Sequence, residues 1–194
     1  MAPKQKHRGP IIDSAVTLFR QYGYAATGIN NIIEFCEAPK GSLYHYFPRG
    51  KPSIAAAAVE EAGRRVCETL SELATNCDTT ADLLRAHAKL LARWMKMSGY
   101  KDGCPMTTVL LELAPEDHAV TAAGRQAYLD RIRILRDKLI SDGFPEPQAS
   151  QLASVCTSAI QGALIEARVQ RSGKPLEIAA EQLGCLLPLA LAKQ

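Results

Sequence analysis

Apolar side chains recur along most of this chain at the three- and four-residue spacing that marks one face of an α-helix. The first stripe runs from Arg8 to Tyr22 and ends at Gly23, a residue suited to a helix C-terminus. A second stripe follows Thr27, which is a good N-cap, and a third follows Pro39, which fits a first helical turn. Breakers at residues 47–52 close the unit. The pattern predicts three short helices in about 50 residues, as in a helix-turn-helix domain.

Longer stripes follow, separated by glycine- and proline-rich turns. No segment alternates between apolar and polar residues as a half-buried strand does. We therefore expect an all-α chain of about nine helices, with a helix-turn-helix domain in residues 1–51 and a C-terminal helical bundle in residues 52–194. The helices expected in the bundle cover residues 53–74, 80–97, 106–113, 116–141, 148–170 and 176–191.

Composition fits this picture, and the placement of charge adds to it. The chain has 194 residues, enough for a buried core, and 47% are hydrophobic but only 6% aromatic. The net charge of +3 is too small to indicate a function by itself. Residues 1–52 carry seven basic and three acidic side chains, whereas the remainder carries sixteen and seventeen. The positive charge therefore lies in the helix-turn-helix segment, as expected for a polyanion-binding surface.

Cysteine usage and hydropathy indicate the compartment. The six cysteines form no CxxC pair, which argues against a disulfide scaffold or zinc site and favours a reducing cytosol. The basic N-terminus lacks the apolar stretch of a signal peptide, and no run of about 18 apolar residues could span a membrane. We expect a cytoplasmic protein with no membrane segment, no metal and no cofactor.

The N-terminal quarter carries a specific signature. With a helix-turn-helix followed by about six more helices, the chain resembles the TetR-type transcriptional regulators, and the stretch APKGSLYHYFPRGK with Gly103-Cys104-Pro105 is similar to the LmrA/YxaF-like branch. The matching residues are Ala15, Leu18, Phe19, Gly23, Tyr24, Thr27, Ile32, the run from Lys40 to Phe47, and Lys51.

The chain departs from the family pattern in the turn. The family usually has Ala-Gly-Val where this chain has Cys36-Glu37-Ala38. Glycine suits that turn because the turn favours a left-handed backbone conformation. Glutamate adopts this conformation at a cost of about 1 kcal/mol. The carboxylate would also face DNA if exposed.

The third predicted helix has two distinct faces. Leu43 and Phe47 are four residues apart and should anchor it against the first two helices. The N-terminus of this helix favours an anion, Lys40 adds a charge there, and Gly41 allows close approach. The resemblance implies base or phosphate contacts along the opposite face. The DNA-binding candidates are Arg8, Thr27, Lys40, Gly41, Tyr44, His45, Tyr46 and Lys51, with Lys4 and Lys6 as an additional basic arm.

The C-terminal bundle shows no catalytic constellation, because His87 and His118 lie on different helices without paired carboxylates. Large adaptable side chains in its middle helices could line an apolar cavity, although such residues also fill ordinary cores. Cys104 precedes a proline-started helix, where the dipole can activate a thiol, although cysteine often acts as a small hydrophobe. The pocket candidates are Trp94, Met95, Met97, Met106, Leu110, Tyr128 and Ile132.

Two C-terminal helices carry small or apolar stripes that allow close helix packing. These stripes could pack within one subunit; the resemblance implies instead a four-helix homodimer interface. A two-fold dimer would also place two recognition helices about one DNA turn, 34 Å, or a multiple apart. The interface candidates are Ala153, Cys156, Ala159, Ala163, Leu183 and Leu187.

These expectations combine into a homodimeric repressor that binds a palindromic DNA operator and is released by a small, hydrophobic effector. One alternative is a repressor that senses oxidants or electrophiles through Cys104. A helical-bundle enzyme would need convergent acid, base or metal groups, and the sequence shows none. A DNA-organising protein would bind without operator preference and ignore effectors.

Overall fold

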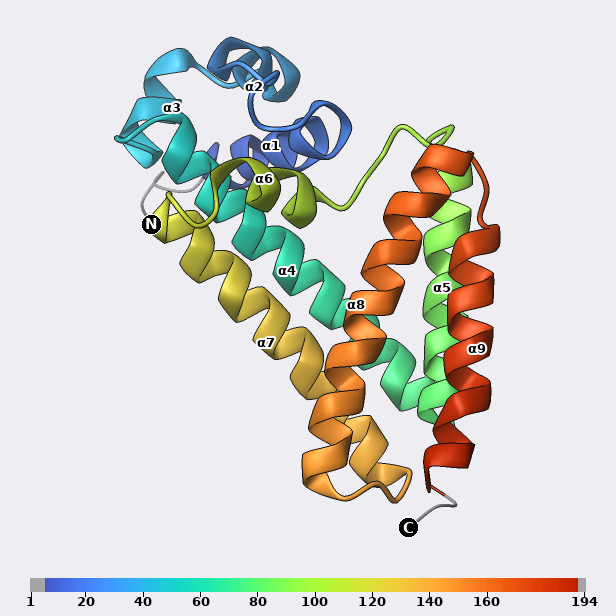
Figure 1. The fold of residues 1–194 in the computed structure, drawn as a ribbon. Helices are drawn as coiled ribbons and strands as arrows, with labels where there is room; N and C mark the ends of the chain where they lie inside the picture. Colours follow the sequence, from blue (N-terminus) through green and yellow to red (C-terminus); the bar gives the residue numbers. More distant parts are fainter. Residues whose placement is uncertain (1–5, 192–194) are drawn as a thin grey trace. The chain divides into compact units, whose positions relative to one another are not determined.

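The computed structural model describes residues 6–191, and every regular element within that range is a helix (Figure 1). The nine helices confirm the predicted all-α fold class. They are α1 (Arg8–Tyr22), α2 (Ile29–Cys36), α3 (Lys40–Tyr46), α4 (Lys51–Asn76), α5 (Thr80–Met97), α6 (Pro105–Leu113), α7 (His118–Ser141), α8 (Glu146–Gln170) and α9 (Lys174–Leu191).

Two compact units make up the described chain. The first unit comprises the residues up to 65 together with 104–127, and the second comprises 66–103 together with the residues from 128 on. Helices α4 and α7 each contribute to both units. The predicted division into a helix-turn-helix domain of residues 1–51 and a C-terminal domain of residues 52–194 stays a prediction.

The first unit is built around α1. Apolar residues on α1, α2 and α3 are removed from solvent together, including Ile11, Phe19, Ile32, Leu43 and Phe47. Helix α1 contacts α2, α3 and α6, as the grouping of these helices in Figure 1 also shows. Burying these side chains provides the main stabilisation of three helices that are too short to be stable alone.

The second unit contains a bundle in which α9 packs on both α5 and α8 (Figure 1). Its core is apolar, with Leu83, Leu84 and Ile160 almost entirely buried. On the surface, Arg85 Nε of α5 donates to Glu181 Oε2 of α9 at 2.8 Å. Both groups are exposed and screened by water, so this ion pair adds little to stability.

Helix boundaries differ from the prediction mainly at prolines. Helix α4 begins at Lys51 and α8 at Glu146, although Pro52 and Pro147 were expected to precede these helices. The first turn of a helix tolerates proline because its N–H groups have no intrahelical acceptor. None of the described helices is long and apolar enough to cross a membrane.

Candidate nucleic-acid interface

Helix α3 presents the two faces expected from the sequence. Leu43 is fully buried and Phe47 is 3% exposed. Lys40, Gly41, Tyr44 and His45 are all exposed, and Tyr44 is 48% accessible although its ring is large and largely apolar. An exposed aromatic beside a lysine and a histidine on a helix anchored from behind is a surface suited to base edges and phosphates.

The turn between α2 and α3 keeps a left-handed residue despite the missing glycine. Glu37 has φ 52° and ψ 29°, and its N–H donates to the Glu34 carbonyl oxygen at 3.4 Å. The N–H of the next residue, Ala38, donates to the Ile33 carbonyl at 3.3 Å and so ends α2. The side chain of Glu37 is exposed. The turn therefore has the geometry expected of glycine, at the energetic cost of a β-carbon.

Thr27 does not cap α2, so the predicted N-cap was wrong. The N-cap is Gly28, whose N–H donates to the side-chain oxygen of Asn31 at 2.8 Å. The Thr27 hydroxyl instead donates to the Gly23 carbonyl at 2.7 Å, and the residue is only 2% exposed. This hydroxyl holds the loop between α1 and α2 in place and does not face outward toward a phosphate.

The other DNA-binding candidates near α3 differ in exposure. Arg8 is exposed at the start of α1, with its guanidinium 5.8 Å from the centre of the Phe47 ring. Tyr46 is half-buried and lies edge-on to His45, with ring centres 5.1 Å apart. Within the basic arm, Lys6 is exposed, whereas Lys4 lies outside the described residues.

Lys51 is half-buried at the start of α4. Its ammonium lies 4.0 Å from the centre of the Tyr24 ring and donates to the Ala25 carbonyl at 3.5 Å. Burial lowers the pKa of Lys51, while the nearby carboxylate of Glu112 acts in the opposite direction. This lysine is therefore held against the loop between α1 and α2.

The sequence did not reveal a carboxylate that binds this loop. Glu112, on α6, accepts the backbone N–H of Tyr24 at 2.7 Å through Oε1 and that of Ala25 at 2.6 Å through Oε2. The helical periodicity of residues 106–113 gives no hint of these bonds. They depend on how α6 packs on α1, which is a tertiary contact.

The pocket candidates are divided between the two units. In the first unit, Met106 is buried and Leu110 is half-buried. In the second, Met95 is buried, whereas Trp94 and Met97 are 48% and 74% exposed. The half-buried residues of the second unit are Tyr128 and Ile132.

A polar group is buried in the second unit. His87 is 4% exposed, and burial, with a contribution from the charge of Arg131, lowers its pKa to about 3. Arg131 is itself 3% exposed and donates to the side-chain oxygen of Gln161 at 3.0 Å. Thr157, one helical turn before Gln161, is also buried. His87 is thus a neutral histidine packed in the core of the second unit.

The cysteines differ in environment. Cys104 is half-buried at the N-cap of α6, as expected. Cys156 is fully buried, which raises the pKa of its thiol to about 11. Burial also raises the pKa of Cys67 and of Cys77. Among the residues that the structure describes, no three His, Cys, Asp or Glu side chains are grouped as metal ligands would be.

The predicted dimer stripe lies mostly inside the chain. Ala153, Cys156, Ala163 and Leu187 are each at most 6% exposed, so packing within one subunit accounts for them. Ala159 and Leu183 are half-buried. Small residues allow close helix packing, but they do not show whether the neighbouring helix belongs to the same subunit or to a second one.

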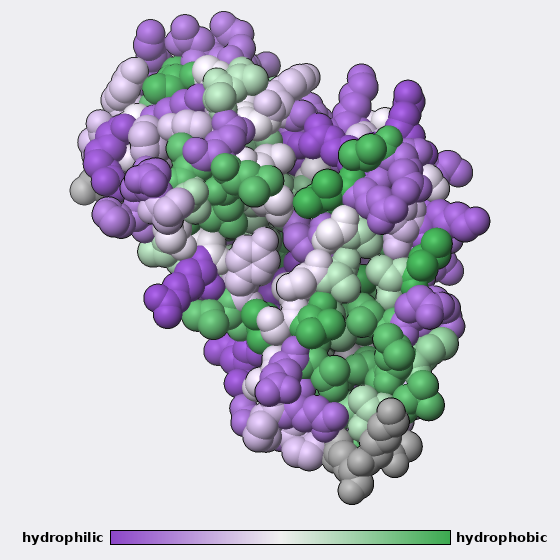
Figure 2. All heavy atoms as spheres, in the orientation of Figure 1, coloured by the Kyte–Doolittle hydropathy of each residue, from purple (hydrophilic) through white to green (hydrophobic). Residues whose placement is uncertain are grey.

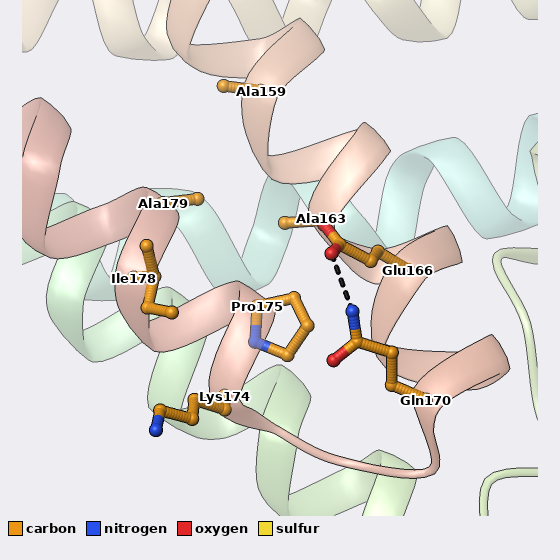
Figure 3. Close-up of a pocket in the computed structure, with 8 residues that line it drawn as sticks. All are labelled: Ala159, Ala163, Glu166, Gln170, Lys174, Pro175, Ile178 and Ala179. Carbon is orange, nitrogen blue, oxygen red and sulfur yellow. Dashed lines mark hydrogen bonds between the residues drawn. The ribbon is translucent and has the colours of Figure 1, made fainter.

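Other residues of the same helices form an exposed apolar face, visible as the green surface over α8 and α9 in Figure 2. The apolar face consists of Val155, Ile165, Val169, Ile178, Leu186 and Leu189, which are 51–78% exposed. Beside it, α8 and α9 enclose an open groove of about 300 Å³ (Figure 3). Glu166 and Gln170 are hydrogen-bonded at its rim at 2.6 Å. The groove is lined by Ala159, Ala163, Glu166, Gln170, Lys174, Pro175, Ile178 and Ala179.

Known proteins resemble the chain along nearly its whole length. Residues 11–58 match the N-terminal domain of bacterial regulatory proteins of the TetR family. Residues 80–182 match the C-terminal domain of LmrA/YxaF-like transcriptional regulators. The HTH-type transcriptional regulator Rv0196 of Mycobacterium tuberculosis is 33% identical over 188 residues, which cover 94% of this chain and 95% of that protein.

Two further similarities agree. The regulator YxaF of Bacillus subtilis is 28% identical over 187 residues, covering 96% of this chain and 98% of that protein. A crystal structure of a TetR regulatory protein from Rhodobacter sphaeroides superposes with a TM-score of 0.79 at 21% identity, covering 91% of this chain and 96% of the other. The chain therefore belongs to the TetR family of transcriptional regulators, in its LmrA/YxaF-like branch.

Proposed function

We propose that this protein is a homodimeric transcriptional repressor that binds a palindromic operator and releases it when a small, mainly apolar molecule binds. The observation that carries the proposal is the division of α3, with Leu43 and Phe47 buried and Lys40, Tyr44 and His45 exposed. An operator-binding protein acts in the cytoplasm, where bacterial DNA lies.

In the proposed DNA interface, residues of α3 contact base edges, whereas residues of α1 and α4 add positive charge. In this proposal Tyr44 and His45 contact base edges in the major groove and Lys40 adds charge near the phosphates, which is supported by the exposure of all three side chains. Arg8 and Lys51 supply further positive charge on α1 and α4. Thr27 contributes by holding the loop before α2, since its hydroxyl is bonded to Gly23.

Dimerisation is supported by the apolar face of α8 and α9. A surface that gathers six large apolar side chains on two adjacent helices favours a protein partner over water. Two copies related by a two-fold axis would bury the same face on each, forming a four-helix interface. A groove between the two helices offers space for side chains of the second copy.

Release of the operator needs only a modest coupling free energy between effector binding and DNA binding. An effector that favours a dimer with the wrong separation of recognition helices shifts DNA affinity by 5- to 150-fold for a coupling of about 1–3 kcal/mol. Helices α4 and α7 run through both compact units, so each offers a continuous path for this coupling. The large apolar side chains of the middle helices favour an apolar effector.

DNA binding is tested by selecting duplexes from a random library with the wild-type protein and measuring affinity by fluorescence anisotropy. We expect an enriched palindrome, with binding that weakens at a log–log salt slope of about −0.9 per phosphate contact. Failure to enrich any sequence at low salt would overturn the repressor assignment.

The dimer is tested by placing a charge on the apolar face. Val169→Glu should convert the dimer to monomers in sedimentation equilibrium, because a carboxylate would be buried in an apolar interface. Leu111→Glu is a matched control, since Leu111 on α6 is 78% exposed, as is Val169. A Val169→Glu protein that remains as dimeric as the control would exclude this face.

A second candidate signal is a thiol-reactive molecule acting at Cys104. The observation that favours it is the position of this half-buried residue at the N-cap of α6, within the first unit. Alkylation should then weaken DNA binding in the wild type and not in Cys104→Ser. Unchanged affinity after complete modification of Cys104 would exclude thiol sensing.

A further inference from the structure

A single carboxylate on α6 binds the loop between α1 and α2. Its two oxygens accept separate backbone N–H groups, from Tyr24 at 2.7 Å and from Ala25 at 2.6 Å. We call this pair of bonds the Glu112 clasp. Hydrogen bonds to an ionised carboxylate are about twice as strong as neutral ones, and two of them fix both position and orientation.

The surrounding residues are arranged to admit the carboxylate. Gly23 has φ 82°, and a β-carbon built on it would lie 2.6 Å from Glu112 Oε1, so a side chain at this position would displace the carboxylate. One turn before Glu112 on the same helix, the Thr108 hydroxyl donates to the Phe19 carbonyl at 3.0 Å. Helix α6 is therefore tied both to the end of α1 and to the loop that follows it.

The loop held by the clasp contacts Lys51 at the start of α4 and leads into α2, which belongs to the proposed DNA-binding unit. The Ala25 carbonyl accepts Lys51, whose ammonium also lies over the Tyr24 ring. Two residues further along, buried Thr27 leads directly into α2. Burial raises the pKa of Tyr24, and the charges of Asp117 and Glu112 add to this effect, so the phenol stays neutral beside the carboxylates.

We propose that Glu112 is a positioning residue for DNA binding. The clasp holds the α1–α2 loop so that Lys51 and α2 keep the arrangement that presents α3 to the operator, and opening the clasp weakens operator binding. Glu112 itself does not touch DNA. The inference rests on the proposed DNA-binding function and adds to it a determinant that lies outside the helix-turn-helix segment.

A simpler role for Glu112 predicts the opposite sign. If this exposed carboxylate were only a surface charge, removing it would lower the repulsion of DNA and tighten binding. If Glu112 positions the α1–α2 loop, removing its charge weakens DNA binding, because the backbone N–H groups of the loop lose their acceptor. The direction of the change therefore separates the two roles.

The experiment compares Glu112→Gln and Glu112→Ala with the wild type on the palindrome that the wild type selects. Glutamine keeps the shape, but its NH₂ group would face one of the two backbone donors. We expect the dissociation constant to rise about tenfold for both variants, equivalent to ~1.4 kcal/mol. Glu116→Gln removes an exposed carboxylate just beyond α6 and should leave affinity equal or slightly tighter. Equal or tighter binding by Glu112→Gln would overturn the proposal.

A double-mutant cycle separates the clasp from general damage to the fold. Gly23→Ala should weaken binding in the wild type by crowding Glu112, and it should cost less in Glu112→Ala, where the crowded oxygen is gone. Additive effects would contradict the clasp. Circular dichroism and sedimentation establish that each variant is folded and dimeric, and a wild type that selects no DNA would refute the repressor assignment itself.

Discussion

Leu43 and Tyr44 are neighbours in sequence but lie on opposite faces of α3, so truncating each to alanine should separate folding from DNA binding. Leu43 is fully buried against the first unit's core, whereas Tyr44 is 48% exposed. Leu43→Ala should destabilise the protein, and Tyr44→Ala should weaken operator binding with little effect on stability.

The expected magnitudes follow from burial. Replacing a fully buried leucine by alanine costs about 2–5 kcal/mol, because apolar contacts are lost and a cavity remains. An exposed substitution usually changes stability by no more than about 0.5 kcal/mol. Loss of a base contact should instead cost about 1–3 kcal/mol of binding, or roughly 5- to 150-fold in affinity.

Urea unfolding followed by far-UV circular dichroism measures the first effect. With a slope of about 2 kcal/mol per molar urea, a loss of ~3 kcal/mol moves the midpoint by about 1.5 M. Fluorescence anisotropy on the selected palindrome, at a temperature where both variants are folded, measures the second. Binding by Leu43→Ala should be close to normal once it is folded.

The reasoning about the two faces of α3 would be refuted if Tyr44→Ala lowered the urea midpoint as much as Leu43→Ala does. It would also be refuted if Tyr44→Ala bound the palindrome as tightly as the wild type. The first result would mean that Tyr44 belongs to the core, and the second that α3 does not read DNA through this residue.

Three further substitutions test other parts of the structure. Glu37→Gly should raise the free energy of unfolding by about 1 kcal/mol, since a left-handed residue loses its β-carbon; an unchanged urea midpoint would contradict this. Because burial lowers the pKa of His87 from 6.5 to about 3, the unfolded state binds the extra proton, so stability should fall as pH falls below 6.5. His87→Gln should show a shallower fall; an equal slope would exclude this source. Gly63→Ala should destabilise by about 1–3 kcal/mol, because its β-carbon would lie 2.5 Å from that of Ala127, whereas Gly9→Ala has open space; equal thermal midpoints would refute the difference.

The sequence predicted local structure well because helical periodicity and turn residues act locally. The stripe from Arg8 to Tyr22 and the buried pair Leu43 and Phe47 are where the pattern placed them. The errors at Pro52 and Pro147 came from treating proline as a breaker in a turn of the helix that tolerates it.

Features that depend on tertiary packing were harder to predict. The hydroxyl of Thr27 could cap a helix or bond to a preceding carbonyl, and the packing of the loop selected the second. Ala153 and Cys156 were expected at a close helix contact, but only the fold shows that both are completely buried within one subunit. The partners of Glu112 lie 87 and 88 residues earlier in the chain, beyond any local pattern.

The central claim is that this protein reads a particular DNA sequence through α3. The most direct test is the ratio of its dissociation constants for a shuffled duplex and for the selected palindrome of the same length, at about 0.15 M salt. A specific regulator should prefer the palindrome by about 10³-fold or more, and Tyr44→Ala should lower that ratio. Equal affinity for the two duplexes would contradict the account.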